Sequence, residues 1–252
     1  MQDIFAEDVG SGTPLVLVHG FLGSSDMWSP QIKFFKDNFR VIAPALPGFG
    51  SSSAMNSCNS IECMANVILN LLEKKKIKNF NLLGHSMGGM IVQEMAKIAG
   101  ETISKLICYG TGPRGNIPGR FETIDQSREK LKTNGLKDTA NRIAKTWFVD
   151  EERAKYFYLC DQAGKQASME ATDNGLIAMK NWDGVENLKN IKNETLIVWG
   201  DQDKAYNFNQ VETLNNNIPN SDLKIIEGCS HNVHLERPYE FNKVVEEFLK
   251  KT

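Results

Sequence analysis

A serine set between two glycines, at Gly84, Ser86 and Gly88, constrains the fold more than any other feature of this 252-residue chain. The residues at 80–83 are mostly apolar, and an apolar-periodic segment follows at 90–96. A strand, a sharp turn and a helix in this order form the context in which G-x-S-x-G presents a reactive serine. The glycines remove Cβ atoms that would collide in so tight a turn. The pattern predicts a nucleophile, Ser86, beside a helix amino terminus, where negative charge is favoured. The alternative is a glycine-rich loop that merely contains a serine.

Strands and helices alternate along most of the chain. Short apolar runs typical of buried strands occur at 15–18, 41–43, 106–109, 196–199 and 223–226. This alternation predicts an α/β fold with a mostly parallel sheet and helices on both of its faces.

Residues 114–183 interrupt the alternation, because they are polar, helix-leaning and without a buried strand. They follow the end of a strand, and open α/β sheets bind their ligands at the carboxyl ends of the strands. We therefore expect a core domain formed by residues 1–113 and 184–252, and a helical cap insertion at 114–183. An insertion that only adds hydrophobic core is the alternative.

Composition and charge exclude several classes of function. The net charge of −2 indicates no basic surface for nucleic acid, and no apolar run approaches the roughly 18 residues of a membrane span. Residues 1–7 lack the features of a signal peptide. The odd, unclustered set of cysteines indicates reduced thiols, a cytoplasmic location and no zinc site; these are Cys58, Cys63, Cys108, Cys160 and Cys229.

The last two strands end in the groups that a serine nucleophile needs. Asp201 and Asp203 follow one strand, and His231 follows the next, so all three lie on the expected ligand edge of the sheet. The chain order Ser86, Asp203, His231 is the order of a Ser-Asp-His triad on this type of sheet. Asp203 is favoured over Asp201, because the acid needs a loop position beyond the strand to reach the histidine.

These motifs together resemble the α/β-hydrolase superfamily over nearly the whole chain. They are H-G-F at 19–21, L-P-G-F-G-S at 46–51, G-H-S-M-G-G at 84–89, G-D-Q-D at 200–203, and His231 with L-E-R-P at 235–238. They resemble the branch of small single-domain esterases, enol-lactonases and carbon–carbon bond hydrolases. The resemblance implies an α/β-hydrolase fold with an eight-stranded, mostly parallel sheet and a cap after the sixth strand. It also implies that Phe21 and Met87 supply backbone N–H groups to an oxyanion hole. One departure is Ala45, where the family often has Asp before Leu-Pro-Gly.

The expected function is that of a serine hydrolase of the carboxylic ester hydrolase type, which cleaves a small ester or lactone through an acyl-enzyme. The lactone rests on the resemblance alone. No metal and no organic cofactor are expected, and the expected partner is a small molecule rather than nucleic acid or a membrane. One alternative is a carbon–carbon bond hydrolase of ring-fission diketones, although Asn232, Val233 and His234 occupy positions where such enzymes often carry tryptophan. The other is a small-ligand receptor on the same fold.

Five side chains are candidates for lining the substrate pocket, and the tryptophans among them could instead simply pack. They are Leu22, Trp28, Trp147, Trp182 and Val233. The natural substrate, its acyl or alcohol specificity and the oligomeric state are not predicted by the sequence.

Three further histidines are expected to have supporting roles. His19 and His85 lie beside the oxyanion loop and the serine, and we expect them to orient or pack rather than carry protons. His234 is expected at the surface or behind the catalytic groups, and Cys229 is expected to be a buried small hydrophobe.

Overall fold

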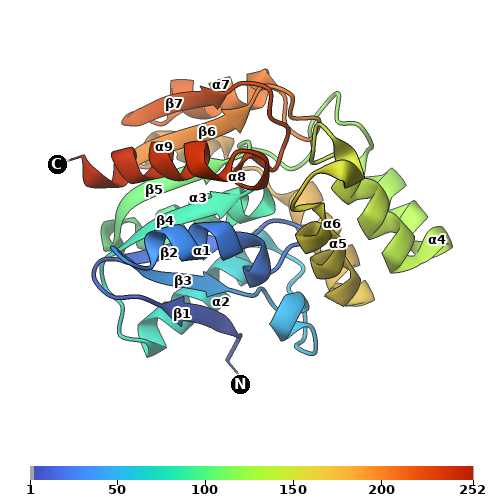
Figure 1. Ribbon diagram of the computed structural model, residues 1–252, viewed down its shortest axis with the longest axis horizontal. Helices are drawn as coiled ribbons and strands as arrows, with labels where there is room; N and C mark the ends of the chain where they lie inside the picture. Colours follow the sequence, from blue (N-terminus) through green and yellow to red (C-terminus); the bar gives the residue numbers. More distant parts are fainter. Residues whose placement is uncertain (1–2, 252) are drawn as a thin grey trace.

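The computed structural model describes residues 3–251, in which one mixed sheet lies between two layers of helices (Figure 1). The strand order is β1-β3-β2-β4-β5-β6-β7. β1 (Ala6–Val9) pairs antiparallel with β3 (Arg40–Pro44). All other neighbours are parallel, and these strands are β2 (Pro14–Val18), β4 (Phe80–His85), β5 (Ile103–Tyr109), β6 (Glu194–Gly200) and β7 (Ser221–Ile226). The predicted α/β fold with a mostly parallel sheet is confirmed.

The sheet has seven strands in the described residues, so the expectation of eight is wrong. Only one strand, β1, precedes β2 between residue 3 and the parallel part of the sheet. The turn at residues 10–13 leads directly from β1 into β2, and β1 closes the edge of the sheet against β3. The helical segment consequently follows the fifth strand rather than the sixth.

Helices cover both faces of the sheet, as predicted. α1 (Ser29–Phe35) and α9 (Pro238–Lys250) lie on one face, where α1 contacts α9 (Figure 1). α2 (Ile61–Lys74), α3 (Met87–Ala99) and α7 (Phe208–Asn217) bury their apolar sides in the core of the other face. Two separate hydrophobic clusters result, and the one beneath α1 and α9 contains Trp28, Tyr109 and Phe241.

Cys58 and Cys63 form a disulfide at the start of α2, so the prediction that all five cysteines are reduced is wrong. The hydroxyl of Ser60 accepts a hydrogen bond from the Cys63 N–H at 3.1 Å and caps the helix. This capped turn brings the two cysteine Cα atoms to 5.7 Å, a separation that a disulfide spans. The cytoplasmic location loses the support of reduced thiols and stays a prediction. Cys108, Cys160 and Cys229 are buried free thiols.

Residues 114–183, which we call the helical insertion, lie beyond the carboxyl ends of the strands (Figure 1). The insertion contains α4 (Ile124–Lys145), α5 (Phe157–Gln166) and α6 (Met169–Asn181), which confirms its predicted helical character. Its two ends meet, because Arg114 forms a β-bridge and a 2.9 Å ion pair with Asp183. The division into a core domain and a cap stays a prediction.

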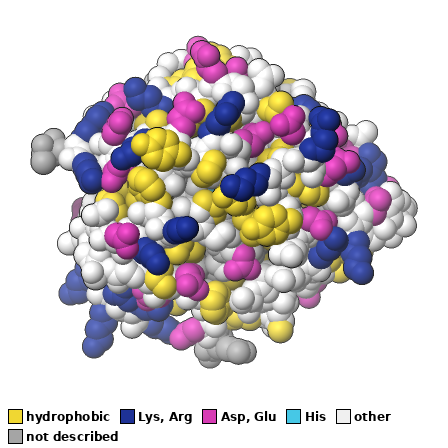
Figure 2. Space-filling view, viewed as in Figure 1, with side chains coloured by type: hydrophobic (Ala, Val, Ile, Leu, Met, Phe, Trp, Pro, Cys, Tyr) yellow, Lys and Arg dark blue, Asp and Glu magenta, His cyan; other side chains and the backbone are white. Residues whose placement is uncertain are grey.

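The surface carries charges of both signs. On the face in Figure 2, Lys and Arg side chains are interspersed with Asp and Glu, in keeping with the small net charge of −2. Within residues 3–251, no helix combines the length and the hydropathy needed to cross a membrane.

Candidate active site

Ser86 occupies the sharp turn between β4 and α3, with φ 57° and ψ −120°, a backbone conformation that is strained for a residue with a side chain. Two hydrogen bonds hold it there: the Ser86 N–H donates to the carbonyl of Tyr109, and the hydroxyl of Thr111 donates to the carbonyl of Ser86, both at 2.9 Å. A Cβ atom at Gly84 would lie 2.2 Å from the carbonyl oxygen of Gly88. The turn therefore requires glycine at that position, as the sequence pattern predicts.

His231 and Asp203 form a buried pair beyond the ends of β7 and β6. Nδ1 of His231 lies 2.9 Å from Oδ2 of Asp203, and the two side chains are 1% and 0% exposed. Oδ1 of Asp203 accepts hydrogen bonds from the N–H groups of Ala205 and Tyr206, at 2.7 and 3.1 Å. Asp201 points elsewhere and accepts from the N–H of Gly228 at 2.7 Å. Of the two candidate acids, the structure brings Asp203 to the histidine.

Two tyrosines that the sequence reasoning missed connect Ser86 with His231. Tyr109 accepts from the Ser86 N–H through its carbonyl, and its hydroxyl donates to the carbonyl of His231 at 2.9 Å. The ring of Tyr206 stacks on the His231 imidazole, with centroids 5.7 Å apart and an interplanar angle of 17°. Burial raises the pKa of Tyr206 to about 12, against the opposing effects of the Arg120 charge and a hydrogen bond with the Ser86 side chain. The phenol therefore stays protonated and lies beside both Ser86 and His231.

Histidines crowd the space behind His231. Nε2 of His85 lies 3.1 Å from the carbonyl oxygen of His231, which thus receives two hydrogen bonds, one from His85 and one from Tyr109. The Tyr109 oxygen accepts from the N–H of His234 at 3.1 Å and meets its Nδ1 at 3.0 Å. Because the single proton of Tyr109 goes to His231, Nδ1 of His234 must carry a proton of its own. His234 is fully buried, so of its two expected positions the structure fits the one behind the catalytic groups and not the one at the surface.

The expected oxyanion loop packs against Ser86. A Cβ atom at Gly20 would lie 2.9 Å from the Cβ of Ser86. The N–H of Phe21 forms no hydrogen bond within residues 3–251, and Met87 is the first residue of α3, where helical N–H groups lack intrahelical partners. His19 fixes this loop, because its Nδ1 lies 2.8 Å from the Gly20 carbonyl and its Nε2 accepts from the Leu46 N–H at 3.0 Å.

The five pocket candidates are not brought together. Leu22 and Trp147 are buried in the cluster that continues into the helical insertion, and the Trp147 ring lies 6.1 Å from the His231 ring. Trp182 donates through Nε1 to Glu94 of α3 at 3.1 Å. Trp28 and Val233 are buried in the other cluster, beneath α1 and α9. The position of Trp28 and Val233 favours packing over substrate contact.

The helical insertion is bound to the loop that carries His231. Glu236 bridges the two, because Oε1 accepts from the N–H of Val149 at 2.7 Å and Oε2 accepts from the N–H of Ser230 at 2.6 Å. The N–H of Asn232 also donates to the carbonyl of Trp147 at 3.0 Å. Burial raises the pKa of Glu236, while these backbone hydrogen bonds lower it.

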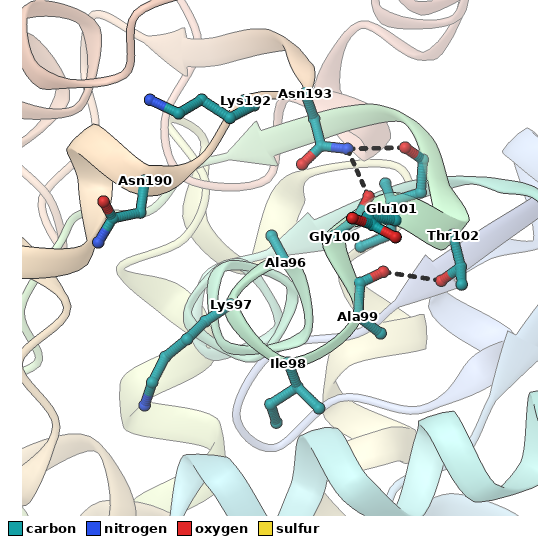
Figure 3. A pocket seen from close by; sticks show the side chains of 11 residues that line it. Ala96, Lys97, Ile98, Ala99, Gly100, Glu101, Thr102, Asn190, Lys192 and Asn193 are labelled. Carbon is teal, nitrogen blue, oxygen red and sulfur yellow. Dashed lines mark hydrogen bonds between the residues drawn. The ribbon is translucent and has the colours of Figure 1, made fainter.

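A surface recess of about 780 Å³ lies away from these residues (Figure 3). It is formed by the end of α3, the start of β5 and residues 190–193, at the amino ends of the strands. The side chain of Asn193 donates to the carbonyls of Gly100 and Ile103, and the hydroxyl of Thr102 donates to Ala99. The recess holds none of the predicted catalytic residues.

Three buried neutral histidines should make the free energy of unfolding depend on pH. Burial lowers the pKa of His19 to about 4 and of His234 to about 3, and it lowers that of His85 well below 6.5. The unfolded chain therefore binds protons that the folded protein does not bind. As a result, the free energy of unfolding falls as the pH drops below 6.5 toward the histidine pKa values of the folded protein. We expect a loss of about 1 kcal/mol per histidine by pH 5.5.

Urea unfolding at pH 7.5 and pH 5.5 measures this loss. Most carboxylates titrate below this window, so they contribute little. Equal free energies of unfolding at the two pH values would contradict the assignment of three buried neutral histidines.

The chain is similar to a known protein family over most of its length. The family model described as the alpha/beta hydrolase fold matches residues 13–238. The chain belongs to the α/β-hydrolase family. An esterase from Exiguobacterium antarcticum superposes with a TM-score of 0.91 at 25% identity, over 98% of this chain and 96% of that one.

Two curated α/β hydrolases are similar along almost the whole chain. The human monoacylglycerol lipase ABHD6 is 25% identical over 264 residues, which are 95% of this chain and 76% of that protein. The pimeloyl-[acyl-carrier protein] methyl ester esterase of Legionella pneumophila is 27% identical over 250 residues, 99% of this chain and all of that protein. These likenesses confirm the superfamily that the motifs predict.

Proposed function

We propose that this α/β hydrolase cleaves a small carboxylic ester or lactone through an acyl-enzyme on Ser86. The observation that carries the proposal is the buried His231–Asp203 pair, 2.9 Å apart, which Tyr109 connects to a strained serine at the amino end of α3. A serine, a histidine base and an acid that orients the base form the set that nucleophilic acyl transfer needs.

In the proposed mechanism, His231 takes the proton of Ser86 as the serine oxygen attacks the carbonyl carbon of the ester. Asp203 holds the proton on Nδ1 and stabilises the imidazolium that forms. The N–H groups of Phe21 and Met87 receive the oxyanion. The imidazolium then gives its proton to the departing alcohol, which leaves an acyl-serine. His231 next activates a water molecule that attacks this acyl group, and the carboxylic acid leaves as Ser86 recovers its proton.

The relatives support this assignment at the level of enzyme class. They are named as esterases, a lipase and hydrolases, so the predicted carboxylic ester hydrolase is confirmed as a class. The two curated relatives are named for monoacylglycerol and for a pimeloyl methyl ester, both esters of aliphatic acids. We infer that an aliphatic acyl ester is the substrate type to test first, and that no metal or organic cofactor takes part.

A panel of p-nitrophenyl esters, aliphatic lactones and ring-fission diketones tests the proposal. We expect many turnovers per protein molecule on at least one short aliphatic ester or lactone, and none on the diketones. A receptor on this fold would instead release at most one equivalent of product while the ligand raised its melting temperature. Turnover restricted to the diketones would assign carbon–carbon bond cleavage and overturn the proposal.

We infer that the helical insertion acts as a cap that shapes the acyl site, because the Trp147 ring lies 6.1 Å from that of His231. Replacing Trp147 by Ala should move the preferred acyl chain to a longer one, with a change of about 10-fold in relative kcat/KM. A series of p-nitrophenyl esters from acetate to decanoate measures this shift. Tyr158→Ala is the matched control, because Tyr158 belongs to the same insertion and is 52% exposed. An unchanged optimum in the Trp147 variant would remove the support for a cap.

A further inference from the structure

Arg120 is an arginine of the helical insertion that lacks a carboxylate partner. Four other arginines of the insertion form ion pairs, and these are Arg114, Arg128, Arg142 and Arg153. Within residues 3–251, Arg120 takes part in no ion pair and in no side-chain hydrogen bond, although its Nε atom is buried. One donor of the guanidinium is therefore buried without an acceptor among the described residues.

Such an arrangement calls for an anion. A buried donor on a charged group costs free energy unless an acceptor meets it. The guanidinium of Arg120 also lies over an aromatic ring, because its central carbon is 5.7 Å from the centre of the Phe121 ring. A planar guanidinium fork matches the two oxygens of a carboxylate better than any other common partner.

The segment that carries Arg120 runs across Tyr206. At one end, a Cβ atom at Gly112 would lie 3.3 Å from Cδ1 of Tyr206. At the other end, the side chain of Asn207 donates to the carbonyl of Pro118 at 3.4 Å, two residues before Arg120. The chain between Gly112 and Arg120 is thus tied to the loop that places Tyr206.

Tyr206 links this segment with the catalytic groups. Its ring stacks on the His231 imidazole, with centroids 5.7 Å apart, and its backbone N–H donates to Oδ1 of Asp203 at 3.1 Å. Among the described residues, Arg120 is the one cation whose charge lowers the pKa of this phenol, against the larger effect of burial. The segment that carries Arg120 therefore lies against the loop that places Tyr206 on His231.

We propose that Arg120 binds a carboxylate group of the substrate, so that the enzyme prefers monoesters of dicarboxylic acids over neutral esters of the same chain. The inference rests on the proposed ester hydrolysis at Ser86. The carboxylate of the acyl chain pairs with the guanidinium and supplies the acceptor that none of the described residues provides. Because the acyl chain stays on Ser86 after the alcohol leaves, this contact assists both acylation and deacylation.

Monoethyl adipate and diethyl adipate form the test pair, because they share the acyl skeleton and differ in the charge at its far end. Acid release in a pH-stat gives kcat/KM for each. We expect the wild-type protein to prefer the monoester. In Arg120→Gln the ratio of monoester to diester kcat/KM should fall by about 10- to 100-fold, the effect of losing a hydrogen-bonded ion pair.

Two further variants separate a binding role from general effects. Arg120→Lys keeps the charge but loses the fork, so it should recover only part of the ratio. Arg153→Gln removes another arginine of the insertion, whose side chain is 83% exposed, and should keep the wild-type ratio. A fall of the ratio in Arg153→Gln as large as in Arg120→Gln would overturn the specific role of Arg120.

The outcomes also distinguish this inference from the proposed function. Hydrolysis of diethyl adipate with no preference for the monoester, or an equal preference in Arg120→Gln, would overturn the carboxylate site and leave the hydrolase intact. Absence of hydrolysis of either ester and of the p-nitrophenyl panel would overturn the proposed function instead. In that event adipate binding decides the inference: a rise in melting temperature of the wild-type protein but not of Arg120→Gln would support the site, and no rise would overturn it.

Discussion

Replacing Ser86 by Ala should lower the rate of ester hydrolysis by a factor on the order of 10⁶. The serine oxygen is the proposed nucleophile, and without it only binding and the oxyanion donors remain. Alanine keeps the Cβ atom and the backbone conformation at φ 57°, so we expect the fold to persist. Initial rates on one activated ester, with circular dichroism and melting temperature alongside, measure both effects.

Covalent labelling provides the matching control for Ser86. A serine-directed phosphonate should modify one residue, and peptide mass spectrometry should place the adduct on the peptide that contains Ser86. The Ala variant should take up no label. Hydrolysis by Ser86→Ala at a wild-type rate, or an adduct on another residue, would show that the nucleophile lies elsewhere.

Replacing Asp203 by Asn should lower kcat by about 10⁴, because the amide favours the wrong tautomer of His231. Asn is close in shape, and its carbonyl oxygen can still accept from the N–H groups of Ala205 and Tyr206, which now bind Oδ1 of Asp203. The fold should therefore survive. Steady-state kinetics on the activated ester used for Ser86 give the comparison.

Asp201 supplies the matched variant for Asp203, since it lies two residues away in the same loop. Its carboxylate accepts from the N–H of Gly228 and does not contact His231. Asp201→Asn should change kcat only slightly. A larger loss at Asp201 than at Asp203 would mean that the wrong carboxylate has been assigned.

Local patterns explain which parts of the site the sequence predicts. The glycines around Ser86 are required by the steric limits of one tight turn, so this turn can be predicted without any tertiary information. Asp203 and His231 could be placed because each follows a parallel strand, and parallel strands bring their carboxyl ends to one edge. The pairing of Asp203 rather than Asp201 with the histidine then agrees with the loop position expected from the sequence.

Contacts that depend on tertiary packing could not be predicted in the same way. Tyr109 is read in the sequence as the last residue of a buried strand, and nothing local shows that its hydroxyl reaches His231. Tyr206 lies in a loop, and its stacking on the imidazole depends on how two strand ends approach each other. The Cys58–Cys63 disulfide depends on a helix cap that folds the chain back, which the spacing of cysteines alone does not show.

The hydrogen bonds of Glu236 link the position of the helical insertion to the ordering of His231. Its carboxylate ties Val149 of the insertion to Ser230, and Trp147 holds Asn232, so both neighbours of His231 are fastened to the insertion. Any movement that lifts residues 147–149 breaks these hydrogen bonds and frees the main chain on either side of the imidazole. Movement of this part of the insertion and ordering of the base are thus linked in free energy, and each favours or opposes the other by the same amount.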